Sequence, residues 1–214
     1  MQTLIDIVLL LVLLSDLYLL SSSRLGASIK VLAFQGVMLS LLPFLSTDMV
    51  RSPHAFVIAI SSCAIKAILI PRLLSRAARE VHIGLEIDSY IPYGASLLAG
   101  MGVVLLSFWV ARKFQLPVTV SSRLWIPVSL AAVMIGLLML IIRKKAISQV
   151  IGYLAMENGI YVLGLSLAAQ MPFLVELGVL LDIFAGVFIM GIILNHIKYY
   201  FDDLDVENLT VLKD

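Results

Sequence analysis

The chain has 214 residues, of which 61% are hydrophobic and 14% are charged, and its formal net charge is +1 at pH 7. A soluble domain is nearer half apolar and about a quarter charged, so water is not the solvent for most of this surface. The small net charge excludes a global attraction to nucleic acid. The single cysteine, Cys63, excludes an internal disulfide and a multi-cysteine iron–sulfur or zinc site. We therefore expect no redox cofactor and no catalytic centre in this chain alone.

Apolar stretches long enough to cross a bilayer follow one another along the chain. A hydrocarbon core of about 30 Å needs roughly 20 residues of helix at about 1.5 Å per residue. Each stretch must be helical, because hydrocarbon offers no partner to an unpaired backbone group. The sequence predicts an all-α, polytopic membrane protein with about seven transmembrane helices, over residues 2–20, 28–46, 54–73, 93–111, 124–143, 148–168 and 172–197.

The basic residues between these spans predict the orientation of the chain. An odd number of spans places the two termini on opposite sides of the membrane. If the C-terminus is cytoplasmic, the loops on that side hold Arg24, Lys30, Arg72, Arg76, Arg79, Arg143, Lys144, Lys145, Lys198 and Lys213. The other side then holds only Arg51, Arg112, Lys113 and Arg123. Cytoplasmic loops carry the excess of Lys and Arg, so we expect N-out, C-in.

Three ionisable residues lie near the middle of their predicted spans: Lys66, Glu157 and Asp182. A charge at the bilayer centre costs at least about 2.5–3.5 kcal/mol, so such residues usually face a protein interior or a water path. Asp6 and Asp16 lie closer to the ends of their span, and we expect them to reach the headgroups.

Two tyrosines flank Glu157 on its predicted helix. Tyr153 and Tyr161 are four residues to either side of Glu157, so the three side chains share one helix face, and the hydroxyls could hold the carboxylate. Burial in hydrocarbon disfavours the charged forms of both acids and amines, and near neutrality protons move readily. One interpretation of Lys66, Glu157 and Asp182 is therefore a proton relay. The others are a static ion pair that specifies helix packing, and placement toward lipid.

The acidic C-terminal tail carries spaced leucines. Between Asp202 and Asp214, Leu204, Leu209 and Leu212 are separated by charged and polar residues. We interpret these leucines as anchors for a partner surface. The longest internal break, residues 72–92, has mixed charge, and an interfacial helix is expected in its first half.

Two segments together resemble a known family. The segment 151–159 (IGYLAMENG) continues to 175–178 (VELG) and Asp182, and the chain ends with 204–213 (LDVENLTVLK). With the stretch 66–71 (KAILIP) of the third span, this sequence is similar to the component E membrane subunit of hydrogenase-4 and formate hydrogenlyase complexes. The resemblance runs along the whole chain and is most specific over residues 148–213.

The last three spans further resemble the three-helix K-type subunit of respiratory complex I, which carries one acid in the proton path on each of its last two helices. Asp182, four residues before Gly186, corresponds to the last-helix acid and replaces a glutamate. Leu154 stands where the other acid is expected, and Glu157 follows it by three residues. The resemblance thus implies a role for Glu157 displaced by nearly one helical turn.

The resemblance implies a membrane-arm subunit that contributes to proton or sodium translocation, coupled to electron transfer in partner subunits. A nickel–iron centre and iron–sulfur clusters would belong to a soluble redox module, and the membrane partners would be antiporter-like and quinone-site-like subunits in a prokaryotic cell (inner) membrane. The implied division of the chain is 1–111, a four-helix region; 112–197, the K-subunit-like region; and 198–214, a cytoplasmic docking tail. A structural scaffold of the same complex and a free-standing transporter are the alternatives.

Overall fold

The computed structural model describes residues 2–45, 60, 63–80, 87–113, 123–167, 181 and 184–191. These residues form the α-helices α1 (Gln2–Ser21), α2 (Leu25–Leu45), α4 (Ile70–Glu80), α5 (Tyr93–Ala111), α6 (Trp125–Ile142) and α7 (Ala146–Leu167), with a π-helix, η1 (Ala64–Leu69), immediately before α4. A further helical stretch covers residues 184–191. The predicted all-α membrane architecture is confirmed.

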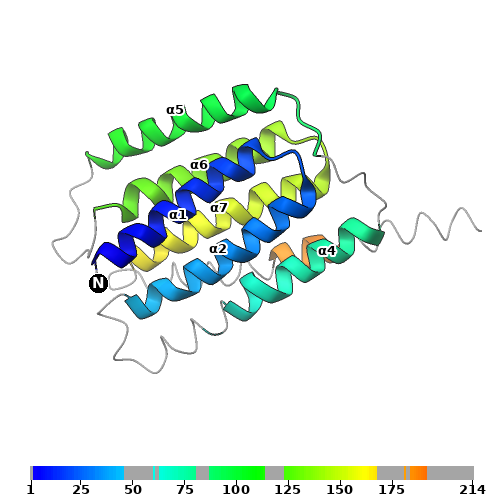
Figure 1. The fold of residues 1–214 in the computed structure, drawn as a ribbon, viewed down its shortest axis with the longest axis horizontal. Helices are drawn as coiled ribbons and strands as arrows, with labels where there is room; N and C mark the ends of the chain where they lie inside the picture. Colours follow the sequence, from blue (N-terminus) through cyan, green and yellow to red (C-terminus); the bar gives the residue numbers. More distant parts are fainter. Residues whose placement is uncertain are drawn as a thin grey trace, which may run out of the picture.

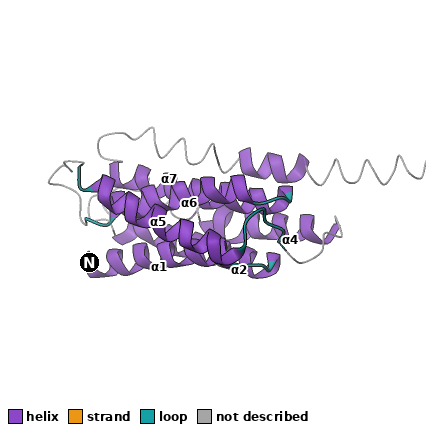
Figure 2. Cartoon of the chain, turned by 90° about the horizontal axis from the view of Figure 1, so that it is seen from above, coloured by secondary structure: helices purple, strands orange, loops and turns teal. Residues whose placement is uncertain are grey.

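The long helices lie side by side along one direction (Figure 1, Figure 2). Helix α1 packs against α2, α2 against α7, α7 against α6, and α6 against α1, which makes a four-helix ring. Helix α5 covers the edge between α1 and α6, and η1 with α4 covers α2. The ring therefore takes two helices from the first half of the chain and two from the second.

Five of the described helices are long and apolar enough to cross a membrane: α1, α2, α5, α6 and α7. They correspond to five of the predicted spans, with ends that agree to within a few residues. The membrane-spanning window of α6 is 61% buried inside the protein, whereas that of α5 is only 17% buried. Helix α5 thus presents most of its surface outward, to lipid or to a neighbouring subunit.

The third predicted span differs from the structure at its C-terminal end. We expected it to end at residue 73, but the helix continues through α4 to Glu80. Pro71 is the second residue of α4 and follows the π-helical turn of η1 directly, at the point where the helix changes from π to α geometry. Arg72, Arg76 and Arg79 follow at helical spacing and are exposed. The helix expected in the first half of the 72–92 break is therefore a continuation of the third span.

The closest helix pair is α6 with α7, and glycines bring the two backbones together. A Cβ atom on Gly136 would lie 2.4 Å from the backbone nitrogen of Met156, and one on Gly159 would lie 2.6 Å from that of Val133. Small residues are what allow such approach in a membrane, where packing replaces the hydrophobic effect as the main attraction. These close contacts fix the position of α7 against α6. Met156 faces α6, whereas the next residue, Glu157, pairs with Lys66 of η1.

Candidate functional site

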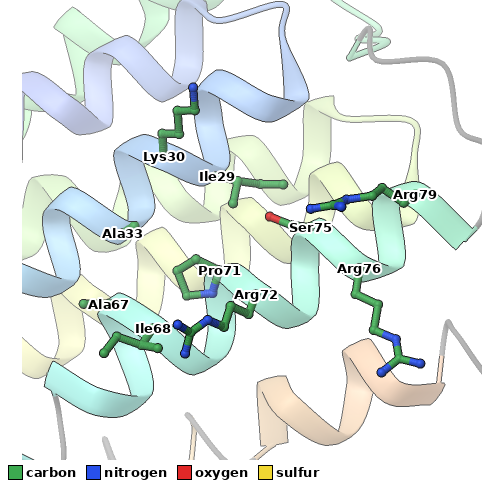
Figure 3. A pocket seen from close by; sticks show the side chains of 10 residues that line it. All are labelled: Ile29, Lys30, Ala33, Ala67, Ile68, Pro71, Arg72, Ser75, Arg76 and Arg79. Carbon is green, nitrogen blue, oxygen red and sulfur yellow. The ribbon is translucent and has the colours of Figure 1, made fainter.

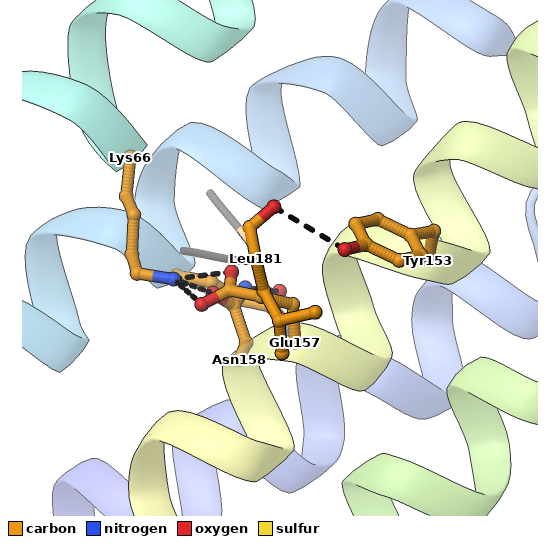
Figure 4. A network of polar contacts seen from close by, with 6 residues as sticks. Lys66, Tyr153, Glu157, Asn158 and Leu181 are labelled. Carbon is orange, nitrogen blue, oxygen red and sulfur yellow. Dashed lines mark hydrogen bonds and ion pairs between the residues drawn. The ribbon is translucent and has the colours of Figure 1, made fainter. Parts of the chain in front are cut away.

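Lys66 and Glu157 form a buried ion pair near the middle of the bundle. Lys66 comes from η1 and Glu157 from α7, and their side chains are 3% and 1% exposed. The Lys66 ammonium donates hydrogen bonds to both carboxylate oxygens of Glu157 and to Asn158 Oδ1 at 3.2 Å, as Figure 4 shows. Its Nζ also lies 5.2 Å from the centre of the Tyr161 ring, within range of a cation–π attraction.

Gly36 on α2 positions the backbone of Lys66. A Cβ atom at Gly36 would lie 2.7 Å from the carbonyl carbon of Lys66 and 2.8 Å from its oxygen, so only glycine allows η1 to pack this closely. The π-helical turn of η1 holds Lys66 there, 5% exposed, with its side chain inside the protein. The position of Lys66 within its predicted span indicates that it lies near the middle of the membrane, but it does not predict the close contact with α2.

The ion pair is one end of a longer hydrogen-bonded series. Asn158 donates from Nδ2 to Gln35 Oε1 at 3.1 Å, and Gln35 donates from Nε2 to Asp16 Oδ1 at 2.7 Å. All five side chains are buried. We call this series the polar chain. Its members, in order, are Asp16 on α1, Gln35 on α2, Asn158 on α7, Lys66 on η1 and Glu157 on α7.

The structure corrects the sequence-based placement of Asp16. We expected Asp16 to reach the headgroups, but its side chain is fully buried, with 0% of its surface exposed. The spans of α1 and α2 also had no assigned role, yet they supply two members of the polar chain. Two signals were present in the sequence: Ser15-Asp16 interrupts one apolar run, and Gln35 interrupts the next. Neither could be paired with the other without the fold.

The two tyrosines of the predicted Glu157 face have different surroundings. Tyr161 is buried beside Lys66. Tyr153 is half-buried, donates a hydrogen bond to the carbonyl oxygen of Leu181 at 3.2 Å, and its ring lies 6.2 Å from that of Phe184. Tyr153 thus faces the segment on either side of Asp182. Asp182 itself lies outside the described residues, as do Leu204, Leu209 and Leu212.

A small cavity adjoins the ion pair. Its volume is about 10 Å³, and Lys66, Glu157 and Asn158 line it together with Leu32, Ile70 and Leu154. That volume is at the threshold for a single water molecule, and the lining offers enough polar partners to hold one. Among the described residues, no group of three or more His, Cys, Asp or Glu side chains could hold a metal ion.

A basic groove is lined by residues of α2, η1 and α4 (Figure 3). Its volume is about 640 Å³, and its basic side chains are Lys30 on α2 and Arg72, Arg76 and Arg79 on α4. Apolar residues, among them Ile68 and Pro71, line the rest. The three arginines are spread along α4.

Arg143 connects the C-terminal end of α1 to the turn between α6 and α7. Its side chain is fully buried, and Nη2 donates to the carbonyl oxygens of Leu19 at 3.0 Å, Leu20 at 2.8 Å and Ser22 at 3.4 Å. The last carbonyl groups of a helix lack hydrogen-bond donors within the helix, and Arg143 donates to two of them in α1. The sequence predicts only that Arg143 is a basic residue of a loop. The structure shows that its buried side chain caps the C-terminal end of α1.

Comparisons with known proteins agree with this architecture. The family model for NADH-ubiquinone/plastoquinone oxidoreductase chain 4L matches residues 124–214, which include α6, α7 and Glu157. An uncharacterised protein of Mycobacterium tuberculosis is 30% identical over 194 residues, 89% of this chain and 87% of that protein. No solved structure matches the chain.

Hydrogenase-4 component E of Escherichia coli K12 is 29% identical to the chain over 204 residues, which is 95% of this chain and 94% of that protein. Hydrogenase-4 component E of Shigella flexneri matches to the same extent. The similarity therefore covers the N-terminal helices as well as the part that resembles chain 4L. The resemblance predicted from the sequence is confirmed: the chain is similar to hydrogenase-4 component E over nearly its whole length, and its C-terminal part matches the family model for chain 4L.

Proposed function

We propose that this chain is a membrane-arm subunit of a hydrogenase-4-like, complex I-related redox complex and that it takes part in proton or sodium translocation. The observation that carries the proposal is the buried Lys66–Glu157 pair. Ionisable residues at membrane depth are costly, and they commonly mark ion pathways. The similarity to hydrogenase-4 component E supports membership of a redox complex. The buried ion pair supports a role in ion translocation.

The chemistry of the pair suits reversible protonation. Glu157 has two acceptor oxygens, and Lys66 is its charged donor. If Glu157 takes up a proton, Lys66 loses its counter-charge in a low-dielectric interior, which favours release of a proton from the ammonium. The neighbouring cavity of about 10 Å³ could admit a water molecule as the local carrier. Asp182 would continue the route on the last span, beside the segment that Tyr153 contacts.

The partners and cofactors follow from this assignment. The membrane partners would be antiporter-like and quinone-site-like subunits, in a prokaryotic cell (inner) membrane. The electrons would pass through a nickel–iron centre and iron–sulfur clusters in the soluble redox module. This chain would add no catalytic centre of its own.

Glu157→Gln tests the proposal in the complete complex, reconstituted into liposomes. We expect normal complex yield and continued electron transfer, with strongly reduced ion translocation per electron, because glutamine keeps the shape but cannot exchange a proton. Asp182→Asn should act in the same way. Asp88→Asn is the matched control, because Asp88 forms an exposed ion pair with Lys145 outside the spans. Normal coupling in both the Glu157 and Asp182 variants would contradict the proposal.

A structural scaffold is the second candidate, because a buried ion pair can also serve only to specify how helices pack. In that case Glu157→Gln would lower the yield of the complex, while each assembled complex would translocate ions normally. Complex yield and translocation per complex, measured on the same preparations, separate the two functions.

A further inference from the structure

Asp16 is a buried acid that forms no ion pair within the described part of the chain. Its helix, α1, packs against α2, α5 and α6. The ionisable side chains in those helices and at their caps are Arg24, Lys30, Tyr93, Arg112 and Arg143. Arg24, Lys30 and Arg112 are exposed. Arg143 binds backbone carbonyls through Nη2, and neither its Nε nor its Nη1 has a hydrogen-bond partner among the described residues, Asp16 included. Asp16 therefore depends on the neutral amide of Gln35 for its described hydrogen bond.

One oxygen of the Asp16 carboxyl is free within the described part of the chain. Oδ1 accepts from Gln35, whereas Oδ2 is buried and has no hydrogen-bond partner there. A buried, unpaired polar atom loses its hydrogen bonds to water without replacement and is rare enough in native proteins to need an explanation. A carboxyl oxygen in this state is a suitable place for a proton, because protonation removes the charge that burial penalises.

The amides of the polar chain all point the same way. Gln35 and Asn158 each direct their NH₂ group toward Asp16 and their carbonyl oxygen toward Lys66. This order suits an acceptor at the Asp16 end and a donor at the Lys66 end, since a lysine ammonium can only donate. The carboxylate and the ammonium thus stabilise the same orientation of both amides from opposite ends, as expected for a cooperative network.

The reverse orientation requires different protonation at both ends. A proton on Oδ2 finds an acceptor among the described residues only if the carboxyl rotates and donates it to Gln35, and in that arrangement both amides must turn. Asn158 then directs its NH₂ group toward Lys66, and only a neutral lysine can accept that hydrogen bond. Proton uptake at Asp16 and proton release at Lys66 therefore favour each other. No proton crosses an amide in this scheme, because each end exchanges its proton locally and the amides transmit only orientation.

We propose that Asp16 is a second proton-binding site and that the Gln35–Asn158 amide pair couples it to the Lys66–Glu157 ion pair. The proposal rests on the proposed function and deepens it: the N-terminal helices would take part in ion translocation, not only the part that resembles chain 4L. Linkage of this kind is reciprocal, so the state of Lys66 and Glu157 also controls proton binding at Asp16.

Two variants of the complete complex in liposomes test the proposal. Asp16→Asn keeps the hydrogen-bonding shape without a titratable group, and Gln35→Met removes the link while leaving both ends in place. For each we expect normal complex yield, continued electron transfer and loss of most ion translocation per electron. Asp6→Asn, on the same helix but outside the polar chain, is the matched control and should couple normally.

Infrared spectroscopy of the same complexes provides a readout besides activity. A protonated carboxyl has a C=O band that a carboxylate lacks. We expect a band that changes during turnover and that Asp16→Asn removes; in the Gln35→Met variant this band should stay constant through turnover. The Gln35→Met arm also decides the matter if Asp16→Asn does not assemble.

The outcomes separate this inference from the proposed function. Normal coupling in Gln35→Met would overturn the inference, as would a turnover-sensitive band that Asp16→Asn leaves in place. If Glu157→Gln abolishes translocation while both new variants behave like the unchanged protein, only the inference fails. If Glu157→Gln and Asp182→Asn both translocate normally, the proposed function fails first. A lower complex yield in Gln35→Met, with normal translocation per complex, would show that the polar chain is structural and would also overturn the inference.

Discussion

Lys66 shows how one residue can serve both packing and chemistry. Its ammonium binds Glu157 and Asn158 and faces the ring of Tyr161, all on α7, while its backbone packs against Gly36 on α2. Breaking a buried pair from one side is far more costly than the pair is worth, because it leaves an uncompensated charge. The same residue thus joins η1 to the four-helix ring and supplies the positive charge that Glu157 pairs with.

Replacing Lys66 tests the packing role. We expect Lys66→Met to destabilise the protein by about 3–5 kcal/mol, because Glu157 is left without its cation. Lys145→Met is the matched control: Lys145 pairs with Asp88 at 3.0 Å, but that pair is exposed and should contribute less than about 1 kcal/mol. The thermal unfolding of the two purified variants in detergent gives the comparison. Equal losses of stability in both would contradict a structural role for the buried pair.

The element scale is dominated by the contact of α6 with α7. Glycines at Gly136, Gly152 and Gly159 allow this contact, and each would bring a Cβ atom within 3 Å of the neighbouring helix. Because α7 carries both Glu157 and Asn158, the position of α7 against α6 also sets where the polar chain meets Lys66. Packing at the glycines and geometry at the ion pair are therefore properties of one helix pair.

We expect Gly136→Ala to destabilise the protein by about 1–3 kcal/mol, because the added methyl group must displace the backbone of Met156. Gly102→Ala on α5 is the control, since nothing lies within 4 Å of its added carbon. At that position the substitution should leave the stability of the protein unchanged or raise it by up to about 1 kcal/mol, because alanine has a higher helix propensity than glycine. Thermal unfolding of both variants decides between crowding and a general effect of losing glycine; a similar melting temperature for the two would exclude crowding.

At the scale of the whole molecule, sequence and structure agree best on what hydrocarbon dictates. Length and hydropathy located the spans that became α1, α2, α5, α6 and α7, and the cost of buried charge identified Lys66 and Glu157. Their direct pairing was one of the interpretations left open by the sequence. The role of Asp16 was missed, because its distance from the helix end suggests the headgroup region, and only the packing of α1 on α2 shows that Gln35 covers it.

The C-terminal end of the third span could not be predicted from the sequence either. Its apolar run ends near Arg72, and hydropathy cannot show that a helix continues once its residues become polar. The orientation N-out, C-in and the division into 1–111, 112–197 and 198–214 remain predictions. So do the roles of Asp182 and of the tail leucines, which lie outside the described residues.

The tail offers a test of assembly. Removing residues 201–214 takes away Leu204, Leu209 and Leu212, and we expect a lower yield of the complete complex. The reason is that apolar anchors bury their surface against a partner, at roughly 25 cal/mol per Å². The triple change of these leucines to alanine should reproduce most of the loss, whereas changing Asp202 and Asp203 to asparagine should have little effect. Size-exclusion chromatography of the solubilised complex measures the yield, and full assembly of the truncated chain would rule out the docking role.

Arg143 makes the C-terminal part of the chain depend on the N-terminal part. The region that matches chain 4L contains Arg143, yet Nη2 of Arg143 donates to the carbonyl oxygens of Leu19 and Leu20 on α1. Its buried Nε and Nη1 have no hydrogen-bond partner among the described residues, so the loss of α1 would remove acceptors that the guanidinium has in this fold. The match to chain 4L therefore marks a region of sequence similarity, not a unit that completes its own hydrogen bonds.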